Sequence, residues 1–205
     1  MRMNLPLSGV WWADVILEDG ASLEGFVKIK TGLWDFNGTV ARSATFGGSV
    51  IARIKGGAGG MANVIGPQAY VSPAFSVPWG DILSKSEEKA SRTADAALLG
   101  TVLEAFHIQQ TTCGRALSQL CGVMGANWRI LPSGLVWAGF DSWTEFTAKI
   151  ETISSDPHLD TALLNVQAPS ILPGTTLHGR RVSRVEYRLD AGGDLEAAVA
   201  FHGDD

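Results

Sequence analysis

The sequence predicts a mainly β protein of the α+β class, in which two β-barrel or sandwich-like parts flank a short two-helix insertion. Apolar residues recur with a period of about 2 near both ends of the chain and with a period of about 3.6 in the middle. Glycine is abundant, at 24 of 205 residues, and separates short apolar runs. We expect a β-rich part at residues 1–80, the helical insertion at 81–126 and a second β-rich part at 127–205.

Four runs in the first part have the alternation or the β-branched content of strands, namely residues 10–17, 26–30, 33–42 and 49–55. The first run ends at a turn signal, Glu18-Asp19-Gly20. A further extended segment is expected at 63–71, because Pro67, Pro73 and Pro78 disfavour a helix through this part.

Two helices are expected in the middle of the chain. The first is predicted from apolar residues at helical spacing between Leu99 and Phe106, namely Leu99, Val102, Leu103 and Phe106. The second carries Leu117, Leu120, Cys121 and Met124, with Thr111 or Thr112 as N-cap and Gly125 just beyond its end. A hairpin follows at 128–137, because Pro132 and Gly134 suit a type I turn.

The last part contains the clearest strand of the chain, residues 180–190. One face carries alternating charges, and Val185, Tyr187 and Leu189 form the other face. A turn at 191–194 and an alternating run at 195–201 complete a second hairpin. The charged face, made of Arg184, Glu186, Arg188 and Asp190, suits either a contact with a neighbouring subunit or a solvated edge that discourages aggregation.

The composition excludes several classes of protein. The formal charge is −5, and a duplex nucleic-acid binder usually carries a basic footprint. Only 18% of residues are charged and seven are tryptophan, so we expect other subunits to cover part of the surface. No apolar run is long enough to span a membrane, and none follows the start as in a signal peptide.

The two cysteines, Cys113 and Cys121, are predicted to be reduced core residues. They lie eight positions apart on the second expected helix, which places them about 12 Å apart. A disulfide requires Cα atoms within about 7 Å of each other.

The glycine cluster at residues 56–60 resembles a dinucleotide-binding motif in its letters only. Residues 57–62 fit the letters G-x-G-x-x-A, and Asp81 follows at a suitable distance. The motif requires a helix that opens at the last glycine, which Pro67 and Pro73 disfavour. No Gly-Lys-Ser/Thr sequence follows, so a P-loop is excluded as well. We expect a sharp turn or bulge that holds no phosphate.

Two further groups of residues are candidates for functional sites. Asp156, His158 and Asp160 lie close together, but a metal site usually needs a fourth ligand, so turn formation around Pro157 is the preferred interpretation. The tryptophans suit a carbohydrate platform or, more simply, core and subunit contacts. We predict no enzyme activity, no catalytic or metal-binding residues and no cofactor; the seven tryptophans are Trp11, Trp12, Trp34, Trp79, Trp128, Trp137 and Trp143.

The order of motifs resembles that of the baseplate hub and tail-tip proteins of bacteriophages, including Mu-like and long-tailed phages. The resemblance rests on residues 12–27, on residues 50–60 followed by 77–83, and most specifically on residues 116–137. In the last region a short helix leads to a hairpin with the sequence W-R-x-L-P-x-G-x-V-W. No motif is catalytic, so no functional residue is transferred. Members of the family tend to be longer, so we expect this chain to lack outer domains.

The resemblance implies a structural protein of the phage tail and a virion location after synthesis in the host cytoplasm. Its partners would be copies of itself in a ring, most simply a trimer, together with the tail tube, the spike and other baseplate proteins. DNA would pass through the ring without sequence-specific binding, which suits the negative charge. Two alternatives stay open: a carbohydrate- or cell-wall-binding module of the tail, and a hydrolase that uses Asp156, His158 and Asp160.

Overall fold

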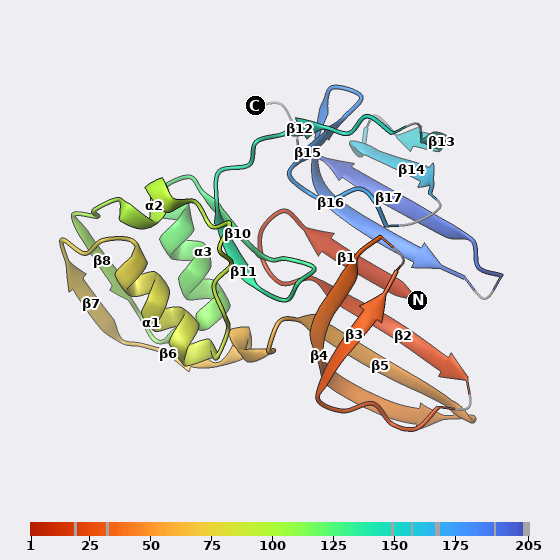
Figure 1. Cartoon of the computed structure of the whole chain (residues 1–205), viewed down its shortest axis with the longest axis horizontal. Helices are drawn as coiled ribbons and strands as arrows, with labels where there is room; N and C mark the ends of the chain where they lie inside the picture. Colours follow the sequence, from red (N-terminus) through yellow and green to blue (C-terminus); the bar gives the residue numbers. More distant parts are fainter. Residues whose placement is uncertain are drawn as a thin grey trace.

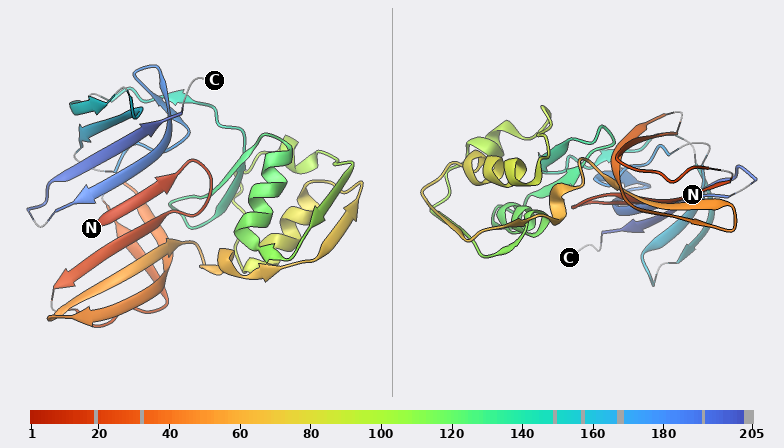
Figure 2. Two further views of the ribbon diagram at one scale, coloured as in Figure 1. Left: turned by 180° about the vertical axis from the view of Figure 1, so that it is seen from behind. Right: turned by 90° about the horizontal axis from the view of Figure 1, so that it is seen from below.

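The computed structural model describes residues 1–18, 20–31, 33–148, 150–156, 158–166, 169–190 and 192–202. Strands make up 48% of the chain and helices 15%, so the mainly β prediction is confirmed. In every view the helices lie together at one end of the molecule and the long strands at the other (Figures 1 and 2).

The long strands form one eleven-stranded sheet with the main order β13-β14-β17-β16-β1-β2-β5-β4-β3. The strands on this path are β1 (Arg2–Pro6), β2 (Trp12–Glu18), β3 (Phe26–Lys30), β4 (Asp35–Phe46), β5 (Ser49–Gly56), β13 (Glu151–Asp156), β14 (Thr161–Asn165), β16 (Arg180–Leu189) and β17 (Leu195–Phe201). Two short strands, β12 (Thr144–Glu145) and β15 (Thr175–Leu177), pair with each other in parallel, and β15 also pairs with β16.

The barrels expected in the two β-rich parts are not found among the described residues, and β1 links the two parts. This strand pairs antiparallel with β2 on one side and with β16 on the other. It thereby joins the N-terminal and C-terminal strands into a single sheet, in which the described residues form no closed barrel. The sequence does not predict β1, because only Met3 and Leu5 carry its apolar alternation, which is too short a signal.

The strands expected from alternation are confirmed. The run at 26–30 is β3, and Val50, Ala52 and Ile54 on β5 are all buried on one side. The two hairpin strands of the last part are β16 and β17. Buried residues alternate strictly along β17, whereas a register shift between Val182 and Arg184 interrupts the alternation on β16. The expected turns at 18–20, 156–160 and 191–194 each include a residue outside the described part of the chain, namely Asp19, Pro157 and Ala191.

Tyr187 on β16 illustrates how the sheet binds the segment that covers it. Its hydroxyl donates to the Ile171 carbonyl at 2.6 Å and accepts from the Ile171 N–H at 2.8 Å. Both residues are fully buried, and burial raises the pKa of the Tyr187 phenol. The tyrosine therefore satisfies both backbone groups of a buried loop residue.

Replacing Tyr187 by phenylalanine is expected to lower the free energy of unfolding by about 1–3 kcal/mol, because it leaves two buried backbone groups unpaired. Urea denaturation measures the change. The half-buried Tyr70, whose hydroxyl bonds Gln68 and Asp81 instead of buried backbone groups, supplies the control variant Tyr70→Phe. Equal losses from the two variants would contradict the role assigned to Tyr187.

The helical end differs from the predicted two-helix insertion. It contains three α-helices, a 3-10 turn and four short strands that pair as β6–β9 and β7–β8. These elements are η1 (Gly60–Ala62), β6 (Val64–Ile65), β7 (Gln68–Val71), α1 (Ser76–Ser86), α2 (Ala96–Gly100), β8 (Ala105–Ile108), β9 (Thr111–Thr112) and α3 (Cys113–Val123).

Two helix predictions were wrong. Pro78 lies inside α1, where the first turn tolerates proline because its missing N–H would have had no partner within the helix. The helix expected between Leu99 and Phe106 stops at Gly100, and Phe106 lies on β8. The chain pairs with residues 72–75 instead: the Leu103 N–H donates to the Pro73 carbonyl at 2.9 Å, and the Phe75 N–H donates to the Thr101 carbonyl at 2.8 Å.

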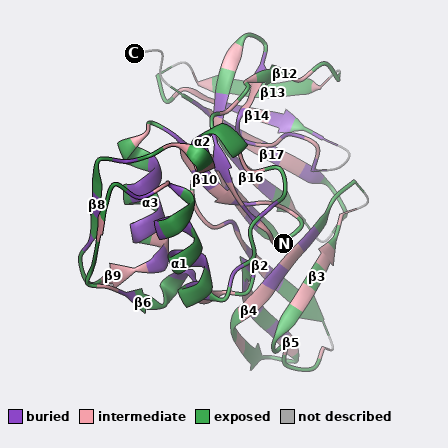
Figure 3. Ribbon diagram, turned by 60° about the vertical axis from the view of Figure 1, so that its left-hand side comes forward, coloured by how far each residue is buried: buried purple, intermediate pink, exposed green. Residues whose placement is uncertain are grey.

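The second predicted helix and the hairpin after it are confirmed. The Thr112 hydroxyl caps α3 by accepting from the Arg115 N–H, and Gly125 adopts a φ of 65° beyond the helix end. Strands β10 (Asn127–Ile130) and β11 (Val136–Gly139) form the hairpin, whose turn closes with the Gly134 N–H on the Leu131 carbonyl at 2.9 Å. Buried residues gather on α3 and on the inner strands (Figure 3).

No helix among the described residues is long and apolar enough to cross a membrane.

Candidate functional site

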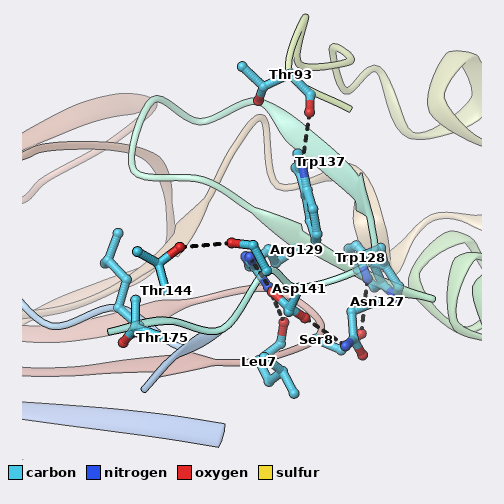
Figure 4. Close-up of polar contacts among 12 residues, drawn as sticks. Leu7, Ser8, Thr93, Asn127, Trp128, Arg129, Trp137, Asp141, Thr144 and Thr175 are labelled. Carbon is cyan, nitrogen blue, oxygen red and sulfur yellow. Dashed lines mark hydrogen bonds and ion pairs between the residues drawn. The ribbon is translucent and has the colours of Figure 1, made fainter. Parts of the chain in front are cut away.

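The hairpin β10–β11 lies where the sheet meets the helical end (Figure 1), and Figure 4 shows the polar contacts around it. Gly9, in the loop after β1, flanks β10: its N–H donates to the Trp128 carbonyl at 2.7 Å, and its carbonyl accepts from the Ile130 N–H at 3.1 Å. On the other side, the Val136 N–H of β11 donates to the Lys89 carbonyl at 2.8 Å. The hairpin is therefore bonded to both ends of the molecule.

An ion pair at the hairpin holds this arrangement together. An Arg129 guanidinium nitrogen lies 2.7 Å from an Asp141 carboxylate oxygen, and the Asp141 side chain is only 1% exposed. Asp141 also accepts from the Asn127 amide at 2.8 Å, and Arg129 donates to the Leu7 carbonyl at 3.1 Å. The guanidinium stacks over the ring of Trp137, 4.2 Å from its centroid. We call Asn127, Arg129, Trp137 and Asp141 the hairpin junction.

The indole N–H groups of the hairpin extend the junction into the helical end. Trp128, 2% exposed, donates to the Ser118 hydroxyl of α3 at 3.0 Å. Trp137 donates to the Thr93 carbonyl at 3.0 Å. Trp128, Arg129 and Trp137 of the W-R-x-L-P-x-G-x-V-W motif thus connect the hairpin to neighbouring elements. Each of the three uses side-chain N–H groups in these contacts within the chain.

The glycine cluster at 56–60 forms the expected sharp turn, and a carboxylate fills it. Gly57 and Gly59 adopt φ values of 74° and 86°. The buried Glu88 carboxylate accepts from the Ala58 N–H at 2.8 Å and from the Gly59 N–H at 3.0 Å. The backbone N–H groups that a phosphate would need are therefore occupied by a side chain of the same molecule.

Burial raises the pKa of Glu88, and the hydrogen bonds from residues 58–60 only partly oppose this shift. Just above its ordinary pKa of 4.5, the native state therefore holds a proton that the unfolded state has released. We expect the free energy of unfolding to fall as the pH rises from the ordinary pKa of Glu88 to its raised pKa in the native state. Urea unfolding from about pH 4 to about pH 7 should show this fall, and Glu88→Gln should flatten it.

The neighbouring exposed Glu87 provides the matched control for that measurement. Glu87→Gln is expected to leave the shape of the pH profile unchanged. Parallel profiles for wild type and Glu88→Gln would contradict the assignment to Glu88.

The cysteines are confirmed as free and buried. Burial raises the pKa of Cys121 to about 12 and also raises the pKa of Cys113. Because the thiolate is the nucleophile, both thiols are unreactive at neutral pH.

Asp156 and Asp160, two of the three residues weighed as a site, have separate partners. The Asp156 carboxylate accepts from the backbone N–H of His158 at 2.9 Å, which is the expected turn-forming role. Asp160 instead binds the Arg180 guanidinium at 2.6 Å. Among the described residues, no group of three histidine, cysteine or acidic side chains is placed to hold a metal ion.

The tryptophans do not form an exposed platform. All seven lie in the described part of the chain, and only Trp34 is classed as exposed. Three others are half-buried, and an arginine covers each ring: Arg53 lies over Trp12, Arg129 over Trp137 and Arg181 over Trp143. The remaining three, Trp11, Trp79 and Trp128, are buried.

The charged strand 180–190 is not an edge strand, because β16 lies between β1 and β17. The interpretation as a solvated edge was therefore wrong. Within the chain, Glu186 pairs with Arg2 at 2.7 Å and with Arg188 at 2.7 Å. Glu186 is thus already neutralised by its own molecule, and Arg184 has no ion-pair partner in the described part of the chain.

Solved structures of tail proteins share this fold. A 43 kDa tail protein of prophage MuSo2 from Shewanella oneidensis matches with a TM-score of 0.65 at 10% identity, covering 98% of this chain and 93% of that one. A tail protein from Neisseria meningitidis MC58 matches with a TM-score of 0.71 at 10% identity, covering 99% of this chain and 91% of that one.

A third similar structure comes from a secretion system. The E. coli c3393 protein is described as a component of the type VI secretion system with structural similarity to the T4 tail proteins gp27 and gp5. It matches with a TM-score of 0.60 at 9% identity, covering 99% of this chain and 73% of that one. No family model and no curated protein matches the chain in sequence. At the level of fold, the resemblance to phage tail proteins is confirmed.

Proposed function

We propose that this chain, which has the fold of phage tail proteins, is a structural protein of a phage tail. It sits at the baseplate hub or tail tip as a symmetric homo-oligomeric ring, most simply a trimer. The ring joins the tail tube to the spike or tip and surrounds the channel through which DNA leaves the particle.

The observation that carries the proposal is the match in fold to tail proteins over nearly the whole chain. The use of the polar residues supports it: the hairpin junction, the Glu88 turn and Tyr187 all connect elements of the fold. The low charged fraction of 18% and exposed apolar side chains such as Phe46 and Ile16 suit a chain that neighbours cover.

Native mass spectrometry of the purified chain tests the ring. The expected species is a small multiple of 21.7 kDa, with three copies the simplest case. Cryo-electron microscopy of purified virions tests the location, and symmetric density for this chain at the tail tip is expected. Its absence from the particle, or its presence only as scattered monomers on the surface, would overturn the proposal. Scattered monomers that bind glycans would support the carbohydrate-binding alternative.

A further inference from the structure

One line of polar residues crosses the open face of the large sheet. The strand registers place these residues opposite one another, one on each of eight consecutive strands. We call them the charged row. From β4 to β13 the row consists of Arg42, Arg53, Asp14, Arg2, Arg188, Glu196, Asn165 and Glu151.

The two ends of the charged row have opposite signs. Four arginines occupy the part from β4 to β16, where Arg53 pairs with Asp14, and Arg2 and Arg188 share Glu186. Arg42, at the outer end, is exposed and has no ion-pair partner among the described residues. Around these arginines the surface forms a hollow of about 650 Å³. The basic end therefore carries an excess of positive charge in a chain whose net charge is −5.

The acidic end lies on β17, β14 and β13. Glu196 and Glu151 flank Asn165, and neither carboxylate has an ion-pair partner within the described ranges. Strand β13 is one edge of the sheet and is almost wholly exposed, whereas β3 beside β4 is the other edge. The unpaired charges of both signs thus lie toward opposite edges of one sheet.

We propose that the charged row continues from one copy of this chain to the next, the acidic end of one meeting the basic end of its neighbour. The proposal rests on the ring put forward above and names the surface that sets its register. A contact between two different faces is the kind that closes into a ring when repeated. Opposite charges at such a contact steer association and exclude wrong registers, while buried apolar area supplies most of the affinity.

Exposed apolar side chains are available on both sides of this contact. Ile16 and Ile51 lie opposite each other next to the basic end, and Phe46 at the end of β4 is 80% exposed. Ile153 on β13 is 51% exposed near the acidic end. A second copy fits the row better than DNA does, because the acidic end, with Glu196 and Glu151, would repel phosphate.

Charge reversal tests the contact. Arg42→Glu and Glu151→Arg each place like charges at the junction of two copies, and each is expected to weaken assembly by about tenfold or more. Combining both changes in one chain restores opposite charges and should recover most of the assembly. Native mass spectrometry and sedimentation over a concentration series measure this, and thermal melting checks that each variant folds. Arg92→Glu and Glu104→Arg, exposed positions on the helical end, are the matched controls.

The outcomes separate the two proposals. Rings that resist both single reversals as well as they resist the controls would overturn the charged-row contact and leave the ring proposal standing. A wild-type chain that stays monomeric would contradict both. If the wild type binds duplex DNA and Arg42→Glu does not, the basic end binds nucleic acid and not a second copy.

Discussion

Replacing Asp141 by asparagine is expected to lower the free energy of unfolding by about 3–5 kcal/mol, because it leaves Arg129 without its charge partner in a nearly dry site. The Asp141 side chain is 1% exposed and that of Arg129 is 18% exposed, so water replaces little of the lost interaction. Asn127 also loses the carboxylate that accepts its amide hydrogen bond. Because the hairpin junction bonds the sheet to the helical end, breaking the ion pair destabilises both parts of the molecule.

Urea denaturation measures the effect, with Asp35→Asn as the control. Asp35 pairs with Lys28 at 3.2 Å, but both side chains are about half exposed, so its loss should cost only about 0–1 kcal/mol. Adding Arg129→Met to Asp141→Asn removes the unpaired charge and should recover part of the stability. Similar losses for Asp141→Asn and Asp35→Asn would show that the buried ion pair does not hold the junction.

Local patterns in the sequence predicted those elements whose signals lie within the element itself or directly beside it. Strand β3 has its predicted bounds because alternation persists over its whole length. Helix α3 was predicted because Thr112 and Gly125 supply the cap signals at its two ends. The hairpin turn followed from Pro132 and Gly134.

Contacts between distant segments could not be predicted in the same way. Strand β1 is short, and its place in the sheet depends on β16, which lies about 180 residues further along the chain. Helical spacing near Leu99 gave a wrong prediction because pairing with residues 72–75 overrode it.

The candidate sites show the same limit. The glycine cluster was visible in the sequence, but Glu88, which fills its turn, is about thirty residues away. The charged row is distributed over eight strands, and each strand contributes a single polar residue of no special character. Only the registers bring these residues into line, so no local signal marks them.

Trp11 is the residue whose truncation is expected to have the other large effect. Its side chain is 2% exposed and packs edge-on against Phe36, with 5.4 Å between the two ring centroids. The indole N–H donates to the Leu131 carbonyl at 3.3 Å. Trp11→Ala should therefore lower the free energy of unfolding by about 3–5 kcal/mol through cavity formation.

Gly38 and Gly56 lie beside Trp11. Substitutions at these two glycines test whether they make room for the indole ring. A Cβ atom at Gly56 would meet the Trp11 indole nitrogen at 2.4 Å, whereas a Cβ at Gly38 would meet the Lys55 carbonyl oxygen at 2.4 Å. Gly56→Ala is expected to cost about 1–3 kcal/mol in the wild type through overpacking. In the Trp11→Ala background the obstacle is gone, so Gly56→Ala should be nearly neutral there.

Gly38→Ala is the matched control in this double-mutant cycle, measured by urea denaturation. Its obstacle is a backbone oxygen that Trp11→Ala does not remove, so it should stay destabilising in both backgrounds. A coupling of more than about 1 kcal/mol is expected between Trp11 and Gly56, well above the few tenths that independent sites show. Additive losses for Trp11 and Gly56 would mean that the glycine serves the turn alone. Coupling would instead show that the first glycine of the cluster exists to make room for the tryptophan, a role that its sequence pattern gave no reason to expect.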